Sequence, residues 1–141
     1  MSKPYIHAIS SARKFGGHPE DYMPVHNLLD SSKGAIPDNR HRALTHNSWF
    51  LSSILEHIHM PAFGWHGALL TRPSDGKVVS VRDIGEQHIL EDFGDRFIPT
   101  AQDYLQEMEI KGWMWNAQSS TPPTSHTRLA EHQFVSGRRI D

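Results

Sequence analysis

Histidine and aspartate recur in this chain at a spacing that could place two metal ligands on one face of a helix. Asp30 follows His26, and Asp92 follows His88, each by four positions, and residues four apart are neighbours on a helix surface. Imidazole and carboxylate groups together suit zinc or a similar divalent metal, whereas calcium and magnesium favour oxygen ligands. The chain holds 11 histidines and no cysteine, which excludes disulfides and thiolate sites. The pattern predicts a metal site but identifies no reaction.

A third histidine-bearing segment, residues 38–46, lies between the two pairs. On a regular helix the side chains of His41 and His46 diverge by about 140°, since a helix has 3.6 residues per turn. The two histidines therefore cannot bind the same ion from a regular helix. One of them would bind the ion, and the other would cap the helix, pack in the core or orient a ligand. Asp38, His41 and Thr45 would share one face. This segment strengthens the prediction of a site without fixing its ligands.

The predicted site has both metal ligands and a general base. The expected ligands are His41, His46 and His88, with Asp92 or His26 completing the set. One coordination position would stay open to a water whose pKa falls towards 7. The expected general base is Glu91 or Glu86. Each His-x-x-x-Asp pair is equally well explained by a hydrogen bond on a helix surface, so the alternative of structural histidines stays open.

Apolar periodicity and turn residues predict a mainly helical α+β fold. Gly16-Gly17 ends the first helix, Asp38 is a candidate N-cap, and Asp75-Gly76 predicts the turn of a hairpin. Thr100, with Asp103 three residues later, predicts the start of the last helix. The expected elements are about five short helices near residues 4–15, 20–33, 38–57, 84–93 and 100–111, with an inserted β-hairpin near 68–82.

The composition changes after residue 115, which predicts a helical domain over residues 1–115 and a polar C-terminal tail over 116–141. The tail is rich in Ser, Thr, Pro and Gln, and such a segment buries too little apolar area to offset its ordering entropy alone. We expect an extended tail that orders by docking onto the body, a second copy or a protein partner, with Phe134 as the leading anchor. Trp113 and Trp115 are further candidates for an oligomeric contact.

Charge and hydropathy exclude several classes of protein. The formal net charge of −2 gives no strong signal for nucleic-acid binding. No apolar run approaches the roughly 18 residues of a membrane helix, and the N-terminus has no apolar segment typical of a secretory signal. A cytoplasmic protein is the expectation. Signatures of serine hydrolases, nucleotide-binding loops and the His-Glu-x-x-His metalloproteases are absent.

Three segments carry a resemblance to a known family: residues 5–17, the run His-Arg-Ala-Leu-Thr-His at 41–46, and Ile-Gly-Glu-Gln-His-Ile-Leu-Glu-Asp at 84–92. Together they resemble a family of small, functionally uncharacterised bacterial and phage proteins, over roughly residues 4–106. The resemblance implies a shared fold and a bacterial or phage setting, but it brings no known activity. Members of that family often have a second histidine after the position of His46, where this chain has Asn47.

Two functions remain in view. The first is a small His/Asp metal-binding domain, in its most specific form a divalent-metal-dependent hydrolase, with zinc as the expected ion. The alternative is a non-catalytic interaction or structural protein of phage or mobile-element origin. The missing catalytic signatures, the four tryptophans and the polar tail favour this alternative.

Overall fold

The computed structural model describes residues 3–115 and 123, and the chain divides into two compact units, Met1–Glu107 and Met108–Asp141. In the second unit, the described residues include one short 3₁₀ turn, η5 (Gly112–Met114). The predicted docking of residues 116–141 lies outside the described residues, apart from Pro123, and the boundary at residue 115 stays a prediction. Within the described part of the chain, every helix is too short or too polar to cross a membrane.

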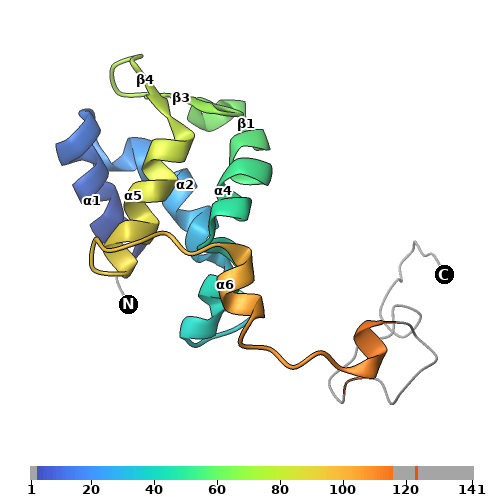
Figure 1. Cartoon of the computed structure of the whole chain (residues 1–141). Helices are drawn as coiled ribbons and strands as arrows, with labels where there is room; N and C mark the ends of the chain where they lie inside the picture. The colour runs from blue at the N-terminus through green and yellow to red at the C-terminus, as the bar shows by residue number, and fades with distance from the viewer. Residues whose placement is uncertain (1–2, 116–122, 124–141) are drawn as a thin grey trace. The chain divides into compact units, whose positions relative to one another are not determined.

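The first unit is mainly helical, which confirms the predicted fold class (Figure 1). Its α-helices are α1 (Pro4–Phe15), α2 (Pro19–Asp30), α3 (Arg42–Thr45), α4 (Ser48–Ser53), α5 (Val81–Asp92) and α6 (Ala101–Leu105). Its 3₁₀ turns are η1 (Ser31–Gly34), η2 (Asn39–His41), η3 (Leu55–His57) and η4 (Pro61–Phe63). Helices α1, α2 and α5 pack against one another in all three pairs, and α4 packs against α5.

A small antiparallel sheet lies at the end of the unit where α5 begins (Figure 1). Its strands, in spatial order, are β1 (His59–Met60), β2 (Trp65–His66), β3 (Leu69–Thr71) and β4 (Val78–Ser80). The predicted hairpin is confirmed as β3–β4, whereas β1 and β2 escaped prediction because two residues are too few for a period-2 pattern. The chain passes from β4 directly into α5, whose N-terminus is capped by the side chain of Ser80.

The prediction of one long helix over residues 38–57 is wrong, because the structure breaks it into η2, α3, α4 and η3. Asp38 caps the first turn as predicted, accepting a hydrogen bond from the backbone N–H of Arg40. His46 then leaves the helical conformation, with φ −100° and ψ 61°. The side chain of Asn47 accepts from the backbone N–H of Phe50 and starts α4 as a new helix. Histidines 41 and 46 therefore do not follow the geometry of a regular helix.

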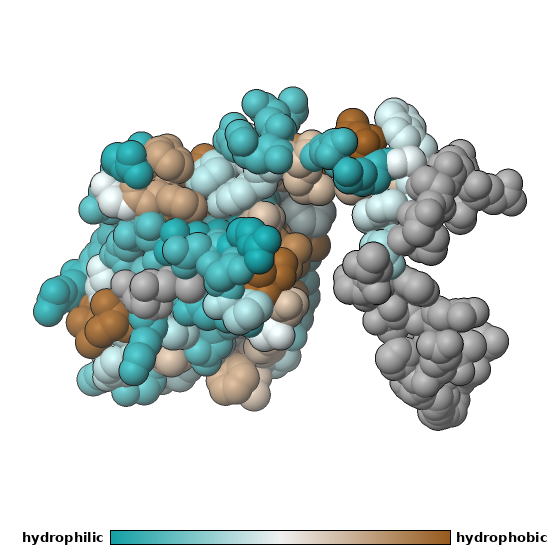
Figure 2. All heavy atoms as spheres, turned by 90° about the horizontal axis from the view of Figure 1, so that it is seen from below, coloured by the Kyte–Doolittle hydropathy of each residue, from teal (hydrophilic) through white to brown (hydrophobic). Residues whose placement is uncertain are grey.

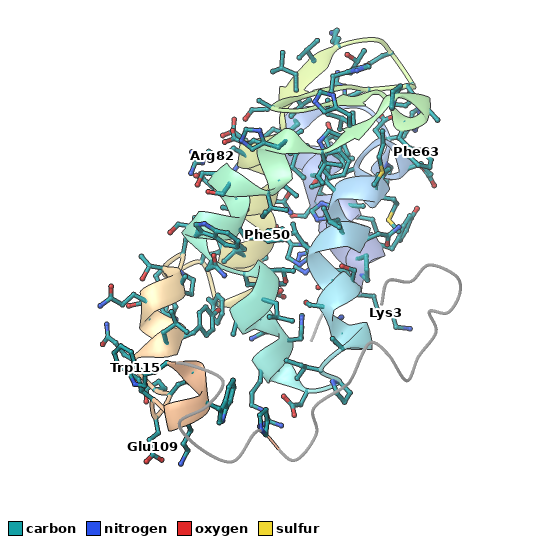
Figure 3. All side chains as sticks on the ribbon, turned by 90° about the vertical axis from the view of Figure 1, so that its right-hand side faces the viewer. Lys3, Phe50, Phe63, Arg82, Glu109 and Trp115 are labelled. Atoms are coloured by element: carbon teal, nitrogen blue, oxygen red, sulfur yellow. The ribbon has the colours of Figure 1, made fainter. Side chains whose placement is uncertain are left out.

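The apolar core joins the helices to the sheet. Its fully or almost fully buried members are Ala8, Tyr22, Val25, Leu29, Phe50, Leu51, Leu55, Trp65, Leu70, Val79, Val81, Ile84 and Ile89. Gly85 lets α5 approach α4 and η3 closely, because a Cβ at this position would lie 2.6 Å from Leu51 Cδ2 and 2.7 Å from Leu55 Cδ2. Phe50 points from its helix into the interior in Figure 3. The face seen in Figure 2 is largely hydrophilic, with hydrophobic residues in small separate patches.

Arg72 ties the hairpin loop to the first two helices. Its guanidinium donates to both carboxylate oxygens of Asp75, at 2.9 and 2.6 Å, and to the carbonyl oxygen of Phe15. Asp21 in α2 accepts from the backbone N–H of Ser74 at 3.0 Å and from its hydroxyl at 2.5 Å. These bonds fix the positions of α1 and α2 relative to the loop between β3 and β4.

Two glycines with almost the same positive φ provide a matched test of the sheet. Gly64 and Gly76 have φ of +77° and +76°, but a Cβ at Gly64 would lie 2.1 Å from the carbonyl oxygen of Thr71, whereas at Gly76 no described atom lies within 4 Å. Gly76→Ala should cost about 1–2 kcal/mol from the left-handed conformation alone. Gly64→Ala should cost at least about 2 kcal/mol more, because the strand backbone must move.

Thermal unfolding measures this difference, and about 1 kcal/mol corresponds to a Tm shift of roughly 4 °C in a domain of this size. Equal Tm values for the two variants would contradict the close approach of Gly64 to β3.

Candidate metal centre

Four side chains from three parts of the chain converge inside the first unit. Asp30 is the last residue of α2, His46 follows α3, and His88 and Asp92 lie one turn apart on α5. One ligand atom from each lies within 4.8 Å of the other three. The side chains of His46 and His88 are fully buried, and those of Asp30 and Asp92 are only 5% and 2% exposed. The packing of α2 against α5 thus places two carboxylates and two imidazoles around one point.

The distances between these atoms are close to those around a small tetrahedral ion. Asp92 Oδ2 lies 2.9 Å from His46 Nε2 and 3.4 Å from His88 Nε2. Asp30 Oδ1 lies 3.3 Å from His88 Nε2 and 3.8 Å from His46 Nε2. Zinc binds nitrogen and oxygen ligands at about 2.0–2.2 Å, which places tetrahedral ligand atoms about 3.4 Å apart. The four distances lie on both sides of this value, and the remaining pairs lie within 4.8 Å, so a small movement of the side chains could surround such an ion.

The hydrogen bonds of Thr45 determine which nitrogen of His46 carries the proton. The hydroxyl of Thr45 donates its one proton to the carbonyl oxygen of Leu29, at 2.7 Å. His46 Nδ1 lies 2.8 Å from the same hydroxyl oxygen, so this nitrogen must be the donor. Burial lowers the pKa of His46 to about 4, so the ring is neutral near pH 7. Its Nε2 then presents a lone pair towards Asp30 and Asp92.

A longer chain of hydrogen bonds orients His88 in the same way. The hydroxyl of Ser11 faces two acceptors, the carbonyl oxygen of His7 and the side-chain oxygen of Gln87, and donates its proton to them. His26 Nε2, 2.7 Å from the same hydroxyl, must therefore be protonated. Because burial lowers the pKa of His26 well below its usual value, its Nδ1 is an acceptor. His88 Nδ1, 2.8 Å away, then donates to it, so that a neutral His88 ring would present the lone pair of its Nε2 to Asp30 and Asp92.

In the tautomers that the outer hydrogen bonds favour, four acceptor atoms would face one another in a dry interior. With a proton on Nε2, His46 donates to Asp92 at 2.9 Å and His88 donates to Asp30 at 3.3 Å. Burial alone would raise the pKa of Asp92, but hydrogen bonds from His46, His7 and His88, made whenever the facing nitrogen carries a proton, hold that pKa well below its usual range. Asp30 follows the same pattern: burial raises its pKa, and His88 more than compensates. Two carboxylates and two lone pairs repel one another unless a cation lies between them. The residues present therefore fit a divalent metal ion.

An outer layer of polar residues supports one of the two carboxylates. His7 Nε2 lies 3.2 Å from Asp92 Oδ1, the oxygen that faces away from the centre, and its ring stacks on that of His88 with centroids 3.8 Å apart. Glu91 accepts at 2.8 Å from His7 Nδ1 and also from the hydroxyl of Ser10. Burial opposes the charged form of His7, but Asp92 and Glu91 raise its pKa above the usual value. Such outer hydrogen bonds orient ligands in known metal sites.

The structure brings some of the predicted site residues together and separates others. His46, His88 and Asp92 belong to the central group. His26 lies behind His88, and His41 is buried with its ring edge-on to His46 at 5.2 Å and its Nδ1 2.7 Å from the hydroxyl of Ser32. Both stand next to the four atoms rather than among them.

The two predicted general bases lie in different surroundings. Glu91 is in the outer layer, with its side chain 27% exposed. Glu86 is 40% exposed and pairs with Arg82 at 3.3 Å. Figure 3 shows Arg82 near the sheet end of the unit.

Sequence reasoning overlooked Asp30 as a ligand and His7 as a support. The sequence pattern that could have identified Asp30 is the first His-x-x-x-Asp pair, but within that pair His26 was the expected ligand. In α5 both members of the pair reach the centre, whereas in α2 only the aspartate does. His7 had no pattern of its own, and only the packing of α1 against α5 places it beside Asp92 and Glu91.

Comparison with known protein families gives one match. The model of a domain of unknown function, DUF6915, matches residues 2–114. The chain belongs to this family. The family carries no assigned activity, in agreement with the resemblance found in the sequence, and its match includes all four residues of the centre. Neither the curated proteins nor the solved structures gave a match.

The hydrogen bond from His46 Nδ1 to Thr45 yields a prediction for metal affinity. Thr45→Val removes the acceptor that orients the ring, so divalent-metal affinity should fall about 10–100-fold, as it does on loss of outer hydrogen bonds elsewhere. Thr45→Ser keeps the hydroxyl and should bind nearly as well as the unaltered chain. Competition against a chelating dye measures the affinity, with circular dichroism to verify the fold. Equal affinities for the valine and serine variants would exclude this role of Thr45.

Proposed function

We propose that this DUF6915 domain binds one divalent metal ion, best satisfied by zinc, through Asp30, His46, His88 and Asp92. The convergence of four buried side chains, each with a possible ligand atom within 4.8 Å of the other three, is the observation that carries the proposal. Two neutral imidazoles and two carboxylates match the borderline character of zinc, and the two carboxylates balance its charge. The hydrogen bonds behind His46 and His88 add the outer support that metal sites require.

A stabilising role for the ion follows from the completeness of this set. Structural zinc sites have four protein ligands, whereas catalytic sites keep a position open. The four ligands come from α2, the segment after α3, and α5, so an ion bound by them would cross-link three parts of the first unit. A site assembled only in the folded chain adds its binding free energy to the stability of the fold.

Metal content and thermal stability test the proposal. Chain purified without a histidine tag should contain about one equivalent of zinc, and zinc added to metal-stripped protein should raise its Tm. The double substitution His46→Ala with His88→Ala should abolish both effects. The control is His59→Ala with His66→Ala, because these exposed residues are paired across β1 and β2 and could capture metal at the surface. That control should retain the zinc and the shift.

The milder variant Asp30→Asn keeps the side-chain volume and should weaken zinc binding while the protein stays folded. The proposal is wrong if the unaltered chain takes up less than a tenth of an equivalent of any transition metal, or if only the surface pair affects uptake.

A hydrolase is the second candidate, and the position of Glu91 favours it. A bound divalent ion would supply Lewis-acid activation at this centre. Glu91 adjoins Asp92 in sequence, its side chain is partly exposed, and its two oxygens contact His7 and Ser10. A carboxylate held in this way could accept a proton at the solvent-facing edge of the centre. This candidate requires the ion to accept a further ligand beyond the four proposed.

Esterase and phosphatase assays on zinc-loaded chain, with p-nitrophenyl acetate and p-nitrophenyl phosphate, test the second candidate. Glu91→Gln should retain zinc and lower kcat by about 10²–10⁴-fold, the usual contribution of a general base. Glu86→Gln is the matched control and should leave kcat unchanged, because Glu86 pairs with Arg82. Turnover that is absent in the loaded chain, or equal in the two variants, would exclude Glu91 as the base.

The non-catalytic alternative, in which the chain binds a protein partner or a second copy through the tail and Trp113 or Trp115, remains a separate proposal. It is compatible with a stabilising metal, because it places the interaction outside the centre. Its support is the composition of residues 116–141 and the two tryptophans that precede them.

A further inference from the structure

Arg42 stands at the edge of the metal centre with few partners for its charge. It is the first residue of α3, and its guanidinium lies over the ring of Phe93, 5.1 Å from the centroid. Arg42 Nη2 is 3.9 Å from Asp92 Oδ1, which is too far for a hydrogen bond. The same Asp92 provides its other oxygen to the proposed metal. Arg42 thus forms a long ion pair with Asp92 but donates no hydrogen bond to it.

The guanidinium of Arg42 is largely withdrawn from water but not satisfied by protein. Its side chain is 14% exposed, and its Nε is buried and has no hydrogen-bond partner among the described residues. A guanidinium has five N–H donors and no acceptor, and buried donors of this kind normally have partners. The remaining exposure leaves the group accessible from solvent. An acceptor supplied from outside the chain would meet this need.

Metal binding would leave less negative charge to balance the positive charge of Arg42. The carboxylates of Asp30 and Asp92 balance a divalent ion, so neither then fully balances the nearby cations. Lys33 Nζ lies 3.4 Å from Asp30 Oδ2, so this cation too would lose part of the charge that balances it. Glu91 is engaged by His7 and Ser10. The loaded centre would therefore attract an anion at the side where Arg42 lies.

We propose that Arg42 forms an anion subsite beside the metal centre, and that the ligand of the centre carries a phosphate or carboxylate group. The planar fork of a guanidinium matches two oxygens of such a group, which lysine cannot do. This inference rests on the proposed metal site and adds to it the chemical class of the ligand. Arg42 is a binding residue in this scheme, with Phe93 holding its plane in place.

Calorimetric titration of zinc-loaded full-length chain with inorganic phosphate, and separately with acetate, tests the subsite. We expect saturable binding of one anion per chain and at least tenfold weaker binding in Arg42→Gln. Arg42→Lys keeps the charge without the fork and should fall between. Arg96→Gln is the matched control, because Arg96 also lies over a phenylalanine, Phe97, at 5.0 Å, but is exposed and donates to the carbonyl oxygen of Phe93. It should bind anions like the unaltered chain.

Zinc content and circular dichroism are measured for each variant before the anion is added, which separates failure of the metal site from failure of the subsite. Preference for phosphate or for acetate would assign the ligand to phosphate esters or to carboxylates, and either supports the subsite. Unchanged anion affinity in folded, zinc-loaded Arg42→Gln would overturn it, as would the absence of saturable binding to the loaded unaltered chain. Failure of the unaltered chain to take up zinc would remove both proposals.

Discussion

The close approach of the carboxylates of Asp30 and Asp92 to Nε2 of His46 and of His88 is the constraint on which the interior of this protein depends. The atoms lie as close as 2.9 Å in a region that excludes water. In a medium of low polarity, unpaired charges at such distances cost far more than a surface ion pair would return. A proton on an imidazole or a divalent cation can relieve this cost, and the helices are arranged so that three parts of the chain meet at this point. The apolar core can then form around a polar centre.

The outer hydrogen bonds make this centre specific. The hydroxyl of Thr45 donates its proton to Leu29 and can therefore only accept a hydrogen bond from His46. The hydroxyl of Ser11 likewise donates elsewhere and accepts from His26, which in turn accepts from His88. Each bond fixes the orientation of one ring. Half-satisfied polar networks destabilise a core, whereas networks with every proton assigned restrict it to one arrangement. This explains why so many buried histidines are compatible with one stable interior: each has a different role, and two alone contribute to the central group of four.

Sequence patterns predicted the parts of this structure that depend on local periodicity. Helix α1 was predicted at its observed bounds, the β3–β4 hairpin followed from Asp75-Gly76, and the His-x-x-x-Asp spacing in α5 identified two members of the centre. Features set by tertiary contacts were missed. The hydrogen bond from Thr45 to Leu29, in α2, accompanies the early end of α3, and no helical period reveals it. The choice of Asp30 over His26 depends on which of the two faces His88 Nε2, and only the packing of α2 against α5 decides this.

The break after Thr45 resolves the difficulty that the sequence posed for His41 and His46. On an unbroken helix the two rings would point about 140° apart, and one ion could not use both. The structure ends α3 just before His46, so this residue is free to turn towards α5 while His41 packs edge-on behind it. Asn47 then restarts the chain as α4 by capping it. Because α3 ends before His46 and Asn47 caps a separate helix, the side chain of His46 can point in a direction that one long helix would not allow. The cost in helical hydrogen bonds is limited, because the side chain of Asn47 donates to the carbonyl oxygen of Ala43 before the break and accepts from the backbone N–H of Phe50 after it.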